Sequence, residues 1–326
     1  MAIMARAGNR RGGSGCESLF RAVVEVECYF DVDDCILWVY PLVLSMVRWR
    51  QSMRDRMHRN LPRGLPGIAL ALLAGLSLPG VAAAEAAIAC DVGSEAKMTP
   101  LVELYTSEGC SDCPPADEWL STLSREEDPA RTSLLAFHVD YWDEIGWIDR
   151  FADPAYSQRQ RVRIKLDNGR TVYTPQVMVG DKTMLDWRDD RRARGALRAV
   201  RERTAPVSLL LRVVVEDARL RVGVRAEPVA GQAPGEGMLW LALYQDGLST
   251  QVRAGENDGL TLRHDRVVRA LKGPWAVGRA PVVGETAIEL PEGADPRRLG
   301  LVLFAESTRD GSAWQSLNMP LADCVR

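Results

Sequence analysis

The residues with the clearest chemistry are two cysteines separated by two residues, in Cys110-Ser111-Asp112-Cys113. Pro114 and Pro115 follow, and prolines are well tolerated in the first turn of a helix, where the N–H groups have no partner. A helix N-terminus stabilises a thiolate through its dipole and its free N–H groups. We therefore interpret Cys110 as a nucleophile that attacks a disulfide and Cys113 as the thiol that resolves the mixed disulfide.

The immediate neighbours of the pair set expectations for its redox behaviour. Glu108 and Asp112 place carboxylates beside Cys110, and negative charge disfavours a thiolate, so they oppose the helix dipole. We expect a potential nearer the reducing end than that of a strong oxidant. A zinc site would need two further ligands, and the sequence has no second CxxC and no HxxxH pattern. No cofactor is expected.

A proline downstream of the cysteines is the second candidate site element, in Tyr173-Thr174-Pro175 ahead of the apolar run 176–179. Base rates favour a trans proline at the start of a strand, but its place after the cysteine pair favours cis. A cis proline beside the pair would leave the preceding backbone free to bind an incoming peptide as an added strand. We predict that Pro175 shapes the site and that Tyr173, Thr174 and Trp142 contact the substrate.

His138 and Asp140 close a predicted strand at 133–139, which would bring them to the same edge as the cysteines. One interpretation makes them acid–base helpers of the thiol chemistry. A second combines His138 with Cys110 and Cys113 in a Cu(I) site of the copper-chaperone type. A third leaves the histidine packing the loop. The residues alone do not choose among the three.

The elements around these residues predict two domains. Apolar strand patterns at 101–105, 133–139 and 172–180 alternate with helical patterns from Pro114, at 154–166 and at 188–203. With the cysteine pair and Pro175, this order predicts an α/β thioredoxin-like domain over residues 87–204. Short alternating strands separated by Gly- and Pro-bearing turns follow, and predict an all-β sandwich-like domain over residues 205–326. We interpret 255–259 as a tight turn, and His264 and Arg269 as structural.

The N-terminal region resembles an export signal. Residues 53–86 combine arginines, an apolar run at 68–78 and small residues near 82–86, as a secretory signal peptide does. The apolar run is well short of the ~20 residues that span a bilayer, so we expect no stable membrane span after cleavage. Residues 1–52 are interpreted as a spurious or disordered extension, or alternatively as a genuine cytosolic extension. The predicted location is periplasmic or secreted.

The net charge and the remaining cysteines indicate which partners and which second disulfide to expect. The formal net charge of −3 shows no basic footprint, so nucleic acid is not expected as a partner. A thiol- or disulfide-bearing protein is expected instead. Cys90 and Cys324 lie near the two ends of the mature chain, and chain termini are often close in space. In an oxidising compartment they are candidates for a structural disulfide, although four cysteines allow three pairings.

Several segments resemble a family of exported bacterial proteins known as DUF1223. The similarity lies in residues 102–117, 137–143 and 172–176, with Gly255-Glu256-Asn257 and Val267-Val268-Arg269 similar to later motifs. It covers roughly residues 98–322. The resemblance implies a thioredoxin-like fold, export and the two-domain layout, and it brings no established substrate.

Three functional hypotheses follow. The first is an exported thiol-disulfide oxidoreductase in which Cys110 attacks and Cys113 resolves. The second is a non-catalytic binding or scaffold module that retains the fold and a structural disulfide, because a fold does not fix a function. The third is periplasmic copper handling through the cysteine pair and His138.

Overall fold

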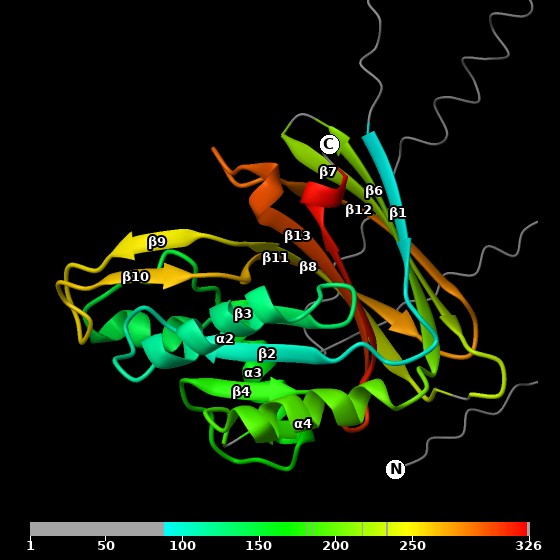
Figure 1. Cartoon of the computed structure of the whole chain (residues 1–326), viewed down its shortest axis with the longest axis horizontal. Helices are drawn as coiled ribbons and strands as arrows, with labels where there is room; N and C mark the ends of the chain where they lie inside the picture. Colours follow the sequence, from blue (N-terminus) through cyan, green and yellow to red (C-terminus); the bar gives the residue numbers. More distant parts are fainter. Residues whose placement is uncertain (1–87, 181, 185, 217, 233, 325–326) are drawn as a thin grey trace, which may run out of the picture. The chain divides into compact units, whose positions relative to one another are not determined.

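The computed structural model describes residues 88–180, 182–184, 186–216, 218–232 and 234–324, and more of these residues lie in strands than in helices (Figure 1). The predicted extension 1–52 and the predicted signal peptide 53–86 lie outside the described residues.

The larger sheet has eight strands in the order β14-β13-β8-β11-β3-β2-β4-β5. Strand β3 is parallel to both β2 and β11, and the other neighbours are antiparallel. In chain order the strands are β2 (Leu101–Thr106), β3 (Ser133–His138), β4 (Gln176–Val179), β5 (Lys182–Met184), β8 (Gly237–Gln245), β11 (Val267–Val277), β13 (Leu299–Ser307) and β14 (Ala313–Pro320).

A second, antiparallel sheet packs against one end of the first. It consists of β1 (Ile88–Gly93), β6 (Val207–Glu216), β7 (Arg219–Pro228) and β12 (Val282–Glu289), in the order β1-β6-β7-β12. Leu211 and Val222 of this sheet share an apolar core with Leu241 and Leu303 of the larger one. A disulfide joins Cys90 of β1 to Cys324, which follows β14 and the turn η3 (Leu321–Asp323).

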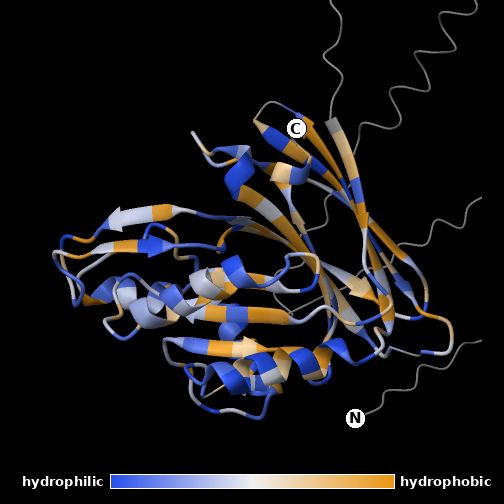
Figure 2. Ribbon diagram, in the orientation of Figure 1, coloured by the Kyte–Doolittle hydropathy of each residue, from blue (hydrophilic) through white to orange (hydrophobic). Residues whose placement is uncertain are grey.

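Helices cover both faces of the other end of the large sheet. Val102 and Leu104 of β2 pack with Leu120 of α2 (Pro114–Glu126) and Leu197 of α4 (Asp190–Arg201). The alternate residues face the other way, toward α3 (Pro154–Leu166), as the period of two in a strand requires. Figure 2 shows that β2 and β4 are largely hydrophobic, whereas hydrophilic and hydrophobic residues alternate along α4. No helix within the described ranges is long and apolar enough to cross a membrane.

The predicted fold class, an α/β thioredoxin-like domain followed by an all-β sandwich-like domain, is wrong. Strand β3, expected to belong to a separate α/β domain, pairs in parallel with β11 at Val267 and Ala136, and the Ala136 N–H donates to the Arg266 carbonyl at 2.8 Å. The strands before and after residue 204 thus form one predominantly β structure. The pairing partners lie far apart in the chain, so hydrophobic periodicity gave no sign of them.

The apolar segment that follows the 252–260 loop forms two strands. The apolar pattern at 260–271 is divided between β10 (Thr261–His264) and β11, because Arg266 has φ 60° and turns the chain between them. Strand β10 pairs with β9 (Leu248–Gln251) in a separate hairpin, which Figure 1 shows lying beside α2. This break directs β10 toward the cysteine pair.

A buried group of four charges ties α3 to strands from both parts of the chain. Arg159 donates to Glu103 of β2 at 2.8 Å and, with two nitrogens, to Glu306 of β13 at 3.0 and 2.8 Å. Nε of Arg163 lies 3.2 Å from Oε2 of Glu103, and its Nη1 lies 3.4 Å from Oε2 of Glu306. Burial opposes ionisation of Glu306, but the two arginines outweigh it and hold its pKa below the usual value.

Removing one charge from this buried group should destabilise the protein strongly, because an unpaired buried charge remains. Glu306→Gln should lower the free energy of unfolding by about 3 kcal/mol, measured by urea denaturation. Asp91→Asn removes one partner of the exposed Arg212 ion pair and serves as the control, with no measurable change expected. Equal effects of the two variants would contradict the role given to the buried group.

Candidate functional site

Cys110 and Cys113 form a disulfide at the turn between β2 and α2, with Cα atoms 5.4 Å apart. Cys113 is the N-cap of α2, and its carbonyl accepts hydrogen bonds from the N–H groups of Ala116 and Asp117 at 2.8 and 3.2 Å. Pro114 and Pro115 occupy the first turn. Both cysteines are buried, at 1% and 0% exposure, so a reagent cannot reach the sulfur atoms without movement of the surrounding residues.

The loop between β9 and β10 holds the cysteine turn from outside. The buried amide of Asn257 donates to the carbonyls of Glu108 and Cys110, both at 2.9 Å. The Glu256 carboxylate accepts from the N–H and the hydroxyl of Ser111 at 3.1 and 2.7 Å. We interpreted 255–259 from the sequence only as a tight turn, and the structure adds these direct contacts with the CxxC segment.

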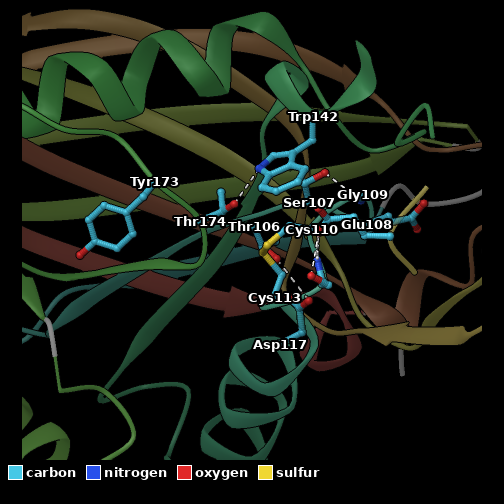
Figure 3. Close-up of a disulfide and its surroundings, with 12 residues drawn as sticks. Thr106, Ser107, Glu108, Gly109, Cys110, Cys113, Asp117, Trp142, Tyr173 and Thr174 are labelled. Atoms are coloured by element: carbon cyan, nitrogen blue, oxygen red, sulfur yellow. Dashed lines mark hydrogen bonds between the residues drawn. A yellow bond between two sulfur atoms is a disulfide. The ribbon is translucent and has the colours of Figure 1, made fainter. Parts of the chain in front are cut away.

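Of the predicted substrate-binding residues, Trp142 and Thr174 lie together near the disulfide. The indole Nε1 of Trp142 donates to Thr174 Oγ1 at 2.7 Å, and Figure 3 shows both beside the sulfur atoms. The Thr174–Pro175 peptide bond is cis. Tyr173 is 37% exposed, and Figure 3 shows its ring directed away from the disulfide.

The predicted helpers His138 and Asp140 have other partners. His138 is fully buried, and its Nδ1 lies 2.6 Å from Asp149 Oδ2. Asp140 accepts a hydrogen bond from the Ser157 hydroxyl of α3, and its N–H donates to that same oxygen at 3.1 Å. No group of three or more His, Cys, Asp or Glu side chains that could hold a metal ion occurs in the described part of the chain.

Two acids and a histidine are buried beside the cysteine turn. Asp117, on the first turn of α2, accepts a hydrogen bond from Thr106 at 3.2 Å, and its Oδ2 lies 3.8 Å from Nδ1 of His264. Nε2 of His264 lies 3.4 Å from Oε1 of Glu108. Figure 3 shows Asp117 on the opposite side of the disulfide from Trp142.

The pKa values of these acids are shifted in opposite directions. Burial raises the pKa of Asp117 to about 7, despite the opposing effects of His264 and Thr106. Burial also opposes ionisation of Glu108, but His264 and the Trp147 indole, which donates at 2.9 Å, hold its pKa below the usual value. The same holds for Asp149, where His138 outweighs burial. The site therefore combines one carboxyl that titrates near neutrality with two that stay ionised.

Asp117, His264, Glu256 and Asn257 were not among the predicted site residues. Asp117 had a detectable signal, because a residue four positions after Cys113 on the predicted helix lies on the same face as that cysteine. His264 had no such signal. The Gly255-Glu256-Asn257 segment resembles a family motif, but only the tertiary structure brings it and His264 to the cysteines.

The chain matches the family described as "Protein of unknown function (DUF1223)" over residues 101–306, and it belongs to that family. This match covers most of the chain. No curated protein matches the chain.

Solved structures similar to it include two with the same TM-score. Protein AGR_C_4864 from Agrobacterium tumefaciens is 20% identical, with 69% of this chain and 96% of that one covered and a TM-score of 0.51. HBP35 of Porphyromonas gingivalis is 14% identical, with 71% and 77% covered and a TM-score of 0.51. At these identities the likeness concerns the fold alone.

Loss of the Asn257 amide should destabilise the cysteine turn, since two carbonyls lose their hydrogen-bond donor inside the protein. Asn257→Ala should lower the free energy of unfolding by about 2–4 kcal/mol in urea denaturation. Asp258→Ala, at the exposed neighbouring position, is the matched control and should have little effect. Similar stability of both variants would show that the loop does not hold the turn.

Asp117 should make stability depend on pH. Its folded pKa of about 7 lies above its ordinary value, so the folded state binds the proton more tightly and stability falls as pH rises from about 4 to 7. Asp117→Asn removes this loss and should raise the free energy of unfolding at pH 8 by up to about 4 kcal/mol relative to wild type, with little difference at pH 4. Denaturant titrations at both pH values, with exposed Asp112→Asn as control, measure this. An equal gain at pH 4 would exclude titration as the cause.

Proposed function

We propose that this member of the DUF1223 family is an exported thiol-disulfide oxidoreductase that acts on protein or small-molecule thiols through Cys110 and Cys113. The observation that carries the proposal is the disulfide at the N-terminus of α2, where the dipole of a 13-residue helix favours a thiolate. Export rests on the signal predicted at residues 53–86, with the periplasm as the expected location.

The reaction follows from the positions of the two sulfur atoms. In the reduced protein, the Cys110 thiolate attacks a substrate disulfide, one S–S bond breaks, and a mixed disulfide forms as the first substrate thiolate leaves. The Cys113 thiolate then attacks Cys110 Sγ and releases the second substrate thiolate. The substrate gains two electrons and the protein retains the Cys110–Cys113 disulfide. A dithiol of another protein would regenerate the reduced state, and the steps also run in reverse.

A substrate can reach the disulfide only by displacing the residues that cover it. Trp142 lies beside the pair, and Asn257 of the 252–260 loop binds the backbone of Glu108 and Cys110. A bound peptide must therefore displace part of this cover. Trp142 and Thr174 are the side chains that it would meet beside the sulfur atoms. Their mutual hydrogen bond is the contact that such a peptide would replace.

Burial of the pair favours a second candidate, a binding or scaffold module in which the disulfide is structural. The cysteines are almost inaccessible, and the Asn257 hydrogen bonds would stabilise a turn that never opens. We do not carry copper handling further, because no contact among the described residues joins His138 to the cysteines and its Nδ1 already binds Asp149.

The reduction potential of the Cys110–Cys113 pair separates the two candidates. Equilibration of the purified protein against glutathione, followed by mass spectrometry of alkylated thiols, should give a value between about −270 and −120 mV if the pair is catalytic. A potential below about −300 mV would assign the disulfide to structure.

Single-cysteine variants test the direction of attack. Cys113→Ala should accumulate mixed disulfides at Cys110, whereas Cys110→Ala should abolish insulin reduction. Removal of Cys90 and Cys324 together is the control for loss of a disulfide without loss of this chemistry. Trapping at Cys113 rather than Cys110 would overturn the assigned roles.

A further inference from the structure

A surface cleft leads from solvent to the buried Asp117 and His264 beside the cysteine pair. It has a volume of about 200 Å³ and opens between the first turn of α2 and strand β10. Pro114, Glu118 and Arg263 lie around it, and its wall includes Asp117 and His264. Both side chains are otherwise buried, at 6% and 2% exposure. The cleft is thus a route by which water reaches these two groups but not the sulfur atoms.

His264 is unusual because both of its ring nitrogens are buried and lack a hydrogen-bond partner. Nδ1 faces Asp117 at 3.8 Å and Nε2 faces Glu108 at 3.4 Å, distances too long for good hydrogen bonds. The Oε1 atom of Glu108 is also unsatisfied. Unpaired buried polar atoms are costly, and their occurrence together points to a role other than stability.

Asp117 faces this histidine from the helix turn that begins at Cys113. It lies four residues after Cys113 on the same helix face, and its own N–H donates to the Cys113 carbonyl at 3.2 Å. Its carboxylate also accepts from Thr106, the last residue of β2. Residues Asp117 and His264 therefore form a chain of two proton-exchanging groups between the cleft and the helix turn that carries Cys113.

We propose that Asp117 and His264 transfer protons between the cleft and the Cys110–Cys113 pair during thiol-disulfide exchange, an inference that rests on the proposed function. When an external thiolate attacks Cys110 Sγ, a new S–S bond forms, the Cys110–Cys113 bond breaks and its electron pair goes to Cys113. The Asp117 carboxyl gives its proton to the Cys113 thiolate, and His264 returns a proton to Asp117 from water in the cleft. A second external thiol then releases Cys110, and the external reagent is left as a disulfide.

The charged groups around Asp117 give the direction of its pH dependence. Glu108 and Asp149 raise its pKa in addition to burial, whereas His264 lowers it, and the result is about 7. His264 also faces His138 of β3, with ring centroids 5.0 Å apart. Glu118 and Arg263 stand at the cleft. Asp117 thus holds its proton below about pH 7 and loses the ability to donate it above that pH.

The test is the rate at which dithiothreitol reduces the disulfide, measured from pH 5 to 9 and divided by the thiolate fraction of the reagent. The wild-type rate constant should fall as pH rises through about 7. Asp117→Asn should remove this step and slow the reaction at pH 5.5 by about a hundredfold, the size of a general acid effect. An unchanged pH profile in Asp117→Asn would overturn the proposal.

A second variant keeps the test independent of any change in folding. His264→Gln should also slow reduction, and free imidazole, small enough to enter the cleft, should restore the rate in that variant only. Glu118→Gln, at an exposed position in the same cleft, is the control and should behave as wild type. Slow reduction of His264→Gln without rescue by imidazole would reject its part in proton transfer.

The two proposals fail in different ways. A wild-type protein whose disulfide has a potential below about −300 mV would refute the oxidoreductase itself. A wild-type protein with a working potential, but with variants that retain its pH profile, would refute only the proton path.

Discussion

The contact between β3 and β11 determines where the parts of the site lie. Its backbone hydrogen bond from Ala136 to the Arg266 carbonyl places the start of β11 beside the strand that ends at His138. Because only two residues separate β10 from β11, the same contact fixes the β9–β10 hairpin next to α2. Asn257 and His264 reach the cysteine turn for this reason. Without this pairing, the CxxC segment would lack both its outer loop and its histidine.

The buried charges of α3 support the same arrangement energetically. Arg159 and Arg163 face Glu103 and Glu306 from strands on both sides of the chain's midpoint, and hydrogen bonds satisfy most of the charges. Such a group contributes little net stability compared with an apolar core, but it is costly to mispair. It therefore favours one relative position of β2, β13 and α3. That specificity suits a site that is assembled from distant segments.

The local features of the chain could be predicted from its sequence, whereas the sheet could not. The α2 helix, the α3 helix and the strands around the cysteines follow from hydrophobic periodicity and from the paired prolines, which act within a few residues. The Cys90–Cys324 disulfide was among the pairings that the sequence allowed, and the structure contains it. The pairing of β3 with β11 depends on backbone groups, which every residue carries, so no residue type marks it. For the same reason Asn257 and His264 looked like ordinary loop and strand residues.

Burial of the cysteine pair has two chemical consequences that act against each other. It removes the sulfur atoms from solvent, which protects the disulfide and restricts attack to a partner that can displace its cover. It also removes the water that would otherwise protonate a leaving thiolate, and a buried thiolate is strongly disfavoured. A carboxyl that titrates near pH 7 and reaches solvent through its own cleft relieves the second effect without exposing the sulfur atoms. A structural disulfide would need no such group, because it never leaves the oxidised state, so the cost of keeping Asp117 and His264 buried argues for a pair that cycles.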